Sequence, residues 1–197
     1  MKDALVVGID EVGRGPIAGP VAVCVCAIDP LRYKRMQWKG LTDSKKMTPK
    51  ARLAWYKEAQ ILKEKELVSS EVIFCSNTII DKKGISFAIK YCIAHGIKKL
   101  SLDPAKTTIL LDGSLRAPKE FNNQKTIIKG DQKEKIISLA SVIAKVTRDR
   151  LMVRLHKKYP EYNWAQNKGY GTKEHYRAIK KNGLTPLHRK TFLNNEK

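Results

Sequence analysis

The chain has 197 residues, 42% of them hydrophobic, which is enough for one domain with an ordinary core. Lysine and arginine number 39 against 19 acidic residues, and the formal charge of +20 favours a polyanionic partner, nucleic acid ahead of an anionic membrane surface. No apolar segment approaches the length of a membrane span and no secretory signal pattern opens the chain, so a cytoplasmic location is expected.

The first apolar run, residues 4–9, is short and rich in β-branched residues, and it predicts a buried strand. It leads into two adjacent carboxylates, Asp10 and Glu11, and then into a loop with a glycine on each side of Arg14. Like charges this close disfavour joint ionisation, and a divalent cation reverses that penalty. Adjacent residues of a regular strand face opposite sides, so the two acids share a site only if the strand twists or ends there.

Periodicity and capping residues predict the remaining elements. Residues 21–28 form a second expected strand, with Cys24 and Cys26 on one face as small core residues carrying reduced thiols. A basic loop is expected over 31–46, and Thr48 and Pro49 suit the start of a helix. Further strands are predicted at 67–75, 107–111 and 125–128, and helices at about 49–64, 85–100, 134–158 and 173–181. Strands and helices mix without strict alternation, which favours a mixed sheet with flanking helices.

Three apolar runs lead to acids: Asp10 with Glu11, Asp112, and Asp131 one glycine beyond its run. Acids at neighbouring strand ends can converge, and Mg²⁺ and Mn²⁺ prefer such oxygen ligands. Four carboxylates could hold two ions about 4 Å apart and clamp the reacting oxygens of a phosphodiester. Each acid alone is also typical of an ordinary turn. Asp149, about 22 Å along the predicted helix from Asp131, is expected only to form a local ion pair.

With these motifs the chain resembles the bacterial type 2 ribonucleases H. The matching segments occur in the family's order and span nearly the whole chain: 8–16, 43–46, 111–113, 129–131, 138–149, 169–172 and 188–192. Val12 stands where alanine is usual and Thr191 where serine is common, and neither change removes a functional group. The related type 3 enzymes usually carry an extra N-terminal domain and a glutamate as the last acid, so Asp131 favours type 2.

The resemblance implies an α/β, ribonuclease H-like fold, with a mixed five-stranded sheet flanked by helices and a helical C-terminal portion. It implies one domain over residues 1–197, in which about 160–197 form a substrate-binding extension. The implied reaction is Mg²⁺- or Mn²⁺-dependent endonucleolytic hydrolysis, with two ions in the catalytic complex. The implied substrates are the RNA strand of RNA–DNA hybrids and single ribonucleotides embedded in duplex DNA, cut on the 5′ side to leave 3′-hydroxyl and 5′-phosphate ends.

Site residues carry over position by position. The implied metal ligands are Asp10, Glu11, Asp112 and Asp131. The 2′-hydroxyl at the cut site would be recognised, partly through backbone groups, by Gly13, Arg14 and Gly15, and the neighbouring sugar would pack against Tyr170. The candidate phosphate contacts are Lys45, Lys46, Arg189 and Lys190. A monomer is expected, with no membrane partner and no clear tail for a sliding clamp.

Other function classes remain open on the sequence alone. A non-catalytic, basic nucleic-acid-binding protein explains the charge but not the four acids. In such a protein Asp10→Asn would leave binding equal or better, with no metal-dependent activity to lose. Another nuclease of the same broad fold, such as a junction resolvase, needs no 2′-hydroxyl and would cut all-DNA substrates. A small-molecule phosphotransferase is more distant, because no glycine-rich nucleotide fingerprint is present.

Overall fold

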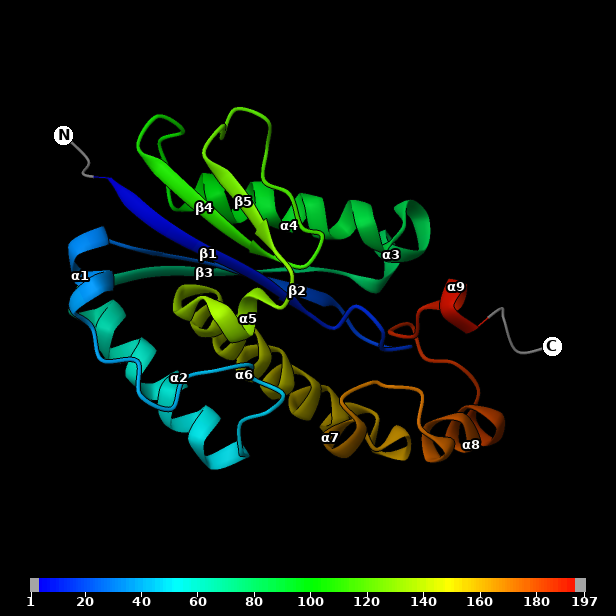
Figure 1. Cartoon of the computed structure of the whole chain (residues 1–197). Helices are drawn as coiled ribbons and strands as arrows, with labels where there is room; N and C mark the ends of the chain where they lie inside the picture. Colours follow the sequence, from blue (N-terminus) through cyan, green and yellow to red (C-terminus); the bar gives the residue numbers. More distant parts are fainter. Residues whose placement is uncertain (1–3, 194–197) are drawn as a thin grey trace.

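The computed structural model of the chain describes residues 4–193. Its centre is a mixed five-stranded sheet in the order β3-β2-β1-β4-β5. The strands are β1 (Leu5–Val12), β2 (Val21–Ile28), β3 (Val68–Cys75), β4 (Thr107–Asp112) and β5 (Gln124–Ile127). The first three pair antiparallel, whereas β1, β4 and β5 run parallel. The carboxyl ends of β1, β4 and β5 therefore meet at one edge of the sheet (Figure 1).

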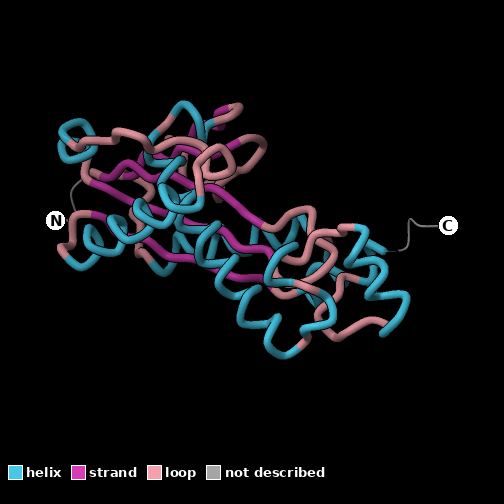
Figure 2. The backbone as a smooth tube through the Cα atoms, turned by 90° about the horizontal axis from the view of Figure 1, so that it is seen from below, coloured by secondary structure: helices cyan, strands magenta, loops and turns pink. Residues whose placement is uncertain are grey.

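Helices cover both faces of this sheet, as the two perpendicular views show (Figures 1 and 2). The long α6 (Lys135–Lys158) and α2 (Pro49–Glu64) pack on one face, and α4 (Ile85–Lys99) with α3 (Asn77–Lys83) packs on the other. The shorter helices are α1 (Pro30–Arg35), α5 (Gly130–Lys133), the 3₁₀ turn η1 (Pro160–Tyr162), α7 (Trp164–Asn167), α8 (Lys173–Asn182) and α9 (Lys190–Leu193). This is the expected α/β architecture with its helical C-terminal portion.

The alternation of side chains along the strands divides the core into two layers. Val7 and Ile9 of β1 face α4, whereas Cys24 and Cys26 of β2 face α2 and α6. The prediction that the two cysteines share one buried face is confirmed, and all four cysteines of the chain are free and buried. Within residues 4–193 no helix is long and apolar enough to cross a membrane.

Gly8 fixes how closely α6 approaches β1. A methyl group at this position would collide with the backbone carbonyl of Ile136, in the first turn of α6. Only glycine lets the helix lie directly on the strand there. The start of α6 is thereby held over the sheet two residues before Asp10, and Ser141 lies further along the same helix.

Most predicted spans are confirmed, but short helices were missed. The expected basic loop over 31–46 begins with α1, which Asp29 caps by accepting a 2.9 Å hydrogen bond from the amide of Arg32. The helix α3 was not predicted, although Ser76 caps it. Asp131 does not simply follow a strand but lies in the single-turn helix α5.

The C-terminal portion has a small core of its own. Ala18, Met152, Tyr162 and Trp164 form a buried cluster against which α8 residues pack. Because Ala18 belongs to the loop between β1 and β2, this cluster joins the C-terminal helices to the segment that follows Asp10 and Glu11.

Candidate metal and nucleic-acid site

Three of the predicted acids meet where β1 and β4 end. The register pairs Ile9 with Leu111, so the next residues, Asp10 and Asp112, are neighbours on adjacent strands. Both lie on the side of the sheet covered by α6. Although β1 itself continues to Val12, β4 stops at Asp112, and Glu11 projects past its end. The negative charge of Asp112 acts on both Asp10 and Glu11, so adjacent strand residues influence a common site without the strand ending at Glu11.

Asp10 is the most deeply buried of the four acids. It is 6% exposed, its Oδ1 accepts a 2.8 Å hydrogen bond from the amide of Glu11, and Ser141 donates a further hydrogen bond. Burial first, and then the charges of Glu11 and Asp112, raise the pKa of Asp10 from 3.8 to about 8, and the two hydrogen bonds oppose this rise. Burial also raises the pKa of Glu11, opposed by Arg14, whose Nη1 lies 3.1 Å from Glu11 Oε1.

The short helix α5 brings Asp131 to the same edge. Asp112 Oδ1 accepts hydrogen bonds from the amides of Gly130 at 2.6 Å and Asp131 at 3.4 Å. Burial, with the charges of Asp112 and Asp43, raises the pKa of Asp131 to about 6. Asp43 is itself buried and hydrogen-bonds Asp131. It was not predicted as a site residue, although an acid two residues before Lys45 in so basic a loop was the available signal.

The donor chemistry of this cluster fits a hard divalent cation. Its side-chain donors are carboxylate oxygens, and burial, together with the neighbouring carboxylates, raises the pKa of Asp10, Glu11 and Asp131. In the part of the chain described, no three His, Cys, Asp or Glu side chains are already drawn together as ligands of one ion. Glu11 is instead turned to Arg14 and Asp112 to the backbone of α5. Binding an ion therefore requires these side chains to rotate inward.

The glycine-flanked loop leaves β1 directly beside the acids. Gly13 has a φ of +88°, and any side chain there would collide with the buried Arg148. Gly15 is exposed, and a Cβ at this position would lie 3.8 Å from the ring of Tyr170. The exposed Tyr170 ring thus lies beside the loop.

The four predicted phosphate contacts differ in position. Lys45 is exposed and close enough to the acids to lower the pKa of both Glu11 and Asp131. Lys46 is exposed and donates to Gln132 Oε1 at 3.0 Å, and Lys190 is exposed at the start of α9. Arg189 is fully buried, and its guanidinium nitrogens all donate to backbone carbonyls. The prediction that Arg189 contacts phosphate is wrong, because its guanidinium has neither access nor a free nitrogen.

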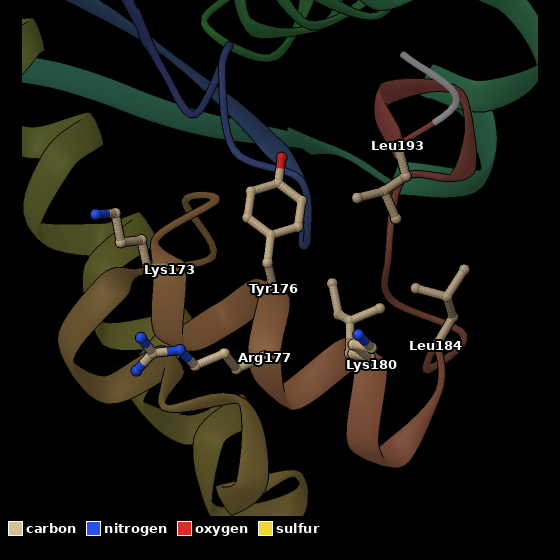
Figure 3. A pocket seen from close by; sticks show the side chains of 7 residues that line it. Lys173, Tyr176, Arg177, Lys180, Leu184 and Leu193 are labelled. Atoms are coloured by element: carbon tan, nitrogen blue, oxygen red, sulfur yellow. The ribbon is translucent and has the colours of Figure 1, made fainter. Parts of the chain in front are cut away.

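Two of the grooves on the described part of the surface are lined by basic residues and lie near the loop or on the C-terminal portion. One, of about 290 Å³, is lined by Arg14, Lys90 and Arg116 and lies between the glycine loop and α4. The other, of about 640 Å³, runs along α8, where Lys173, Arg177 and Lys180 line it together with Leu184 and Leu193 (Figure 3). No acidic residue lines either groove. Asp149 forms the expected local ion pair, 2.8 Å from Lys145 Nζ, which confirms that prediction.

Comparison with known proteins decides the family. The sequence model described as Ribonuclease HII matches residues 7–195. The chain belongs to the ribonuclease HII family. It is 44% identical over 193 residues to the ribonuclease HII of Prochlorococcus marinus subsp. pastoris, covering 95% of this chain and 87% of that protein. Two solved structures are similar in fold. Ribonuclease H2 from Pyrococcus horikoshii OT3 has a TM-score of 0.75 at 27% identity, covering 95% and 93% of the chains. The ribonuclease HII of the PCNA:RNase HII complex from Archaeoglobus fulgidus has a TM-score of 0.73 at 25% identity, covering 94% of each.

Membership of this family makes the chain an endoribonuclease, a hydrolase that acts on RNA–DNA hybrids. A purely nucleic-acid-binding role and small-molecule phosphotransfer are thereby set aside. The acid cluster, the glycine loop and Tyr170 all lie on segments inside the matched range.

Proposed function

We propose that this ribonuclease cuts the RNA strand of hybrids and also cuts 5′ to a single ribonucleotide in duplex DNA, leaving 3′-hydroxyl and 5′-phosphate ends. The observation that carries the proposal is the placement of two features side by side. Asp10, Glu11 and Asp112 gather at one sheet edge, and the loop that begins at Gly13 follows them immediately and lies against Tyr170. One surface can therefore hold a scissile phosphate and inspect the adjacent sugar.

Asp10, Glu11, Asp112 and Asp131 are the proposed ligands of two Mg²⁺ or Mn²⁺ ions. Such ions, when bound, activate water and stabilise the charge that develops on the leaving 3′-oxygen. The chain's own part begins with Asp10, which is largely protonated near neutral pH in the free protein because its pKa is about 8. Asp10 must lose that proton to act as a ligand, and Lys45 and Arg14 moderate the repulsion among the neighbouring carboxylates.

The proposed substrate path runs from the acids over the basic surface. Lys45, Lys46 and Lys190 are proposed to contact phosphates, and the groove along α8 is proposed to take the backbone within the substrate-binding extension of about 160–197. Such contacts position the duplex without reading its sequence. The protein is proposed to act as a monomer in the cytoplasm. The absence of a clamp-binding tail was predicted for a terminus whose last residues, 194–197, lie outside those described.

The test is cleavage of a duplex DNA that holds one ribonucleotide, with Mg²⁺, Mn²⁺ or EDTA. An all-DNA duplex and the Asp10→Asn protein are the controls. The proposal expects a metal-dependent cut on the 5′ side of the ribonucleotide, mapped at single-nucleotide resolution and missing from both controls. Cleavage of long hybrids without cleavage at the single ribonucleotide would refute the embedded-ribonucleotide part. Cleavage of the all-DNA duplex would favour a resolvase-like nuclease.

A further inference from the structure

Arg189 is a fully buried cation held by backbone carbonyls of the opposite end of the chain. Its Nη2 donates to the carbonyl of Gly13 at 2.7 Å, its Nη1 to that of Arg14 at 3.0 Å and its Nε to that of Gly19 at 2.9 Å. A buried arginine with three such bonds is costly to remove and constrains whatever it holds. Here it holds both ends of the loop that follows the catalytic acids.

The hydrogen bonds from Arg189 to the carbonyls of Gly13 and Arg14 fix the direction of the amides that follow them, those of Arg14 and Gly15. The described chain contains no cis peptide, and in a trans peptide the C=O and the following N–H point to opposite sides. The N–H groups of Arg14 and Gly15 therefore point away from the guanidinium of Arg189. No described residue accepts a hydrogen bond from either amide, and both residues are exposed. The loop thus presents two free donors outward, beside the ring of Tyr170.

Backbone and histidine contacts around Arg189 hold this residue in place. Its amide donates to the carbonyl of Ile17 at 2.7 Å, and Ala18 and His188 form a β-bridge. The His188 ring lies 3.1 Å from that of His175, nitrogen to nitrogen. His175 Nδ1 is in turn 2.9 Å from the carbonyl of Tyr170. The loop and Tyr170 therefore share one buried support. Arg148 and His188 hold the later residues of the loop, and Arg189 is the residue that hydrogen-bonds the carbonyls of Gly13 and Arg14.

We propose that Arg189 is a positioning residue for sugar discrimination: it aims the amides of Arg14 and Gly15 at the substrate's 2′-hydroxyl without touching the nucleic acid. This inference rests on the proposed function, since it requires that the loop inspects the sugar. A 2′-hydroxyl can accept from such donors, whereas deoxyribose offers nothing at that position. Phosphate contacts elsewhere would bind RNA-containing and all-DNA duplexes alike.

The experiment compares two proteins that do not cleave, Asp10→Asn alone and Asp10→Asn combined with Arg189→Lys. Lysine keeps the charge but loses the fork that spans two carbonyls. The dissociation constant is measured for a duplex with one ribonucleotide and for the matching all-DNA duplex, over a series of salt concentrations. We expect the preference for the ribonucleotide to fall about tenfold, while all-DNA affinity changes less than about twofold and the salt slope stays the same.

Other outcomes overturn the inference. Equal weakening for both duplexes with a salt slope lower by about one would make Arg189 a phosphate contact, and Lys190→Met supplies that reference pattern. A loss of folded protein with an unchanged preference would make its role purely structural. Equal binding of both duplexes by Asp10→Asn alone would show that the loop does not read the sugar.

A second measurement does not depend on the Arg189 variant folding. In the Asp10→Asn protein the ¹H–¹⁵N signals of Arg14 and Gly15 should shift when the ribonucleotide duplex is added and stay in place with the all-DNA duplex. Identical shifts with both duplexes would refute the inference. The proposed function has its own test in metal-dependent cleavage by the wild-type protein, so failure of one is distinguishable from failure of the other.

Discussion

Replacing Asp10 by asparagine should stabilise the metal-free protein while abolishing cleavage. Asparagine has the shape of a protonated aspartate and keeps an oxygen that can accept from the Glu11 amide. Asp10 has its pKa raised from 3.8 to about 8 by burial and by neighbouring acids. Because the pKa of Asp10 is raised in the folded state, the contribution of its protonated form to stability is fully present below pH 3.8 and is lost as the pH rises towards 8.

The size of the effect follows from this pKa difference. Between pH 3.8 and pH 7 the ionisation of Asp10 costs folding about 1.4 kcal/mol per pH unit, or about 4 kcal/mol in all. The Asp10→Asn protein avoids this cost, so the gap in unfolding free energy should open from near zero at pH 4 to about 4 kcal/mol at pH 7. Urea denaturation in EDTA at several pH values measures the gap directly.

A matched control is Asp149→Asn, the same change in a carboxylate paired with Lys145 outside the acid cluster. It should cost no more than about 1 kcal/mol, with no gain that grows with pH. Adding Mn²⁺ should stabilise the wild type by about 2.7 kcal/mol at one hundred times its dissociation constant, and Asp10→Asn far less. If Asp10→Asn were as stable as the wild type at every pH, the account of Asp10 as a buried acid whose ionisation destabilises the fold would be refuted.

Three further predictions concern the buried His188, the contact of Gly8 with α6 and the exposed Lys45. Burial and a neighbouring histidine lower the pKa of His188 to about 4, so folding loses about 3 kcal/mol from this ring as the pH falls from 6.5 to 4. His188→Gln should remove that part of the acid sensitivity. If urea denaturation showed the unfolding free energies of both proteins falling equally between pH 6.5 and pH 4, the prediction would be contradicted. Gly8→Ala should destabilise by about 3 kcal/mol through collision with Ile136, against about 1 kcal/mol for Gly40→Ala, which meets open space. Lys45→Ala should weaken binding of ribonucleotide-containing and all-DNA duplexes equally and lower the salt slope by about one, whereas an unchanged slope would place Lys45 off the phosphate path.

Elements with strong local signals were predicted closely. The helix α2 begins at Pro49 because Thr48 caps it, its Oγ1 accepting from the amide of Ala51 at 3.2 Å, and the sequence alone indicates both features. The short helices α1, α3 and α5 span too few residues for a hydrophobic period to appear. The capping residues of α1 and α3, Asp29 and Ser76, could be read in the sequence, but a cap without a hydrophobic period is also typical of a turn, and α5 has no side-chain cap at all.

The acid cluster was predictable because its members mark strand ends in a strongly basic chain. What the sequence could not supply was their relation in space. Glu11 lies beside the site because β4 stops next to Asp10, and Asp43 hydrogen-bonds Asp131 although the two residues lie far apart in the sequence. Both depend on pairing between segments far apart in the chain, and no local pattern encodes such pairing.

Arg189 shows why a basic residue near the end of a basic chain is easily misread. Its sequence neighbours, His188 and Lys190, suggest a solvated surface, and composition favours a phosphate partner for any such cation. Its real partners are carbonyl oxygens, which every residue possesses and which leave no trace in a sequence. A guanidinium is well matched to them because its donors form a rigid planar fork. The chain therefore uses its cations in two ways. Exposed lysines are placed to contact the phosphates of the substrate, and the buried Arg189 holds the loop proposed to contact the sugar.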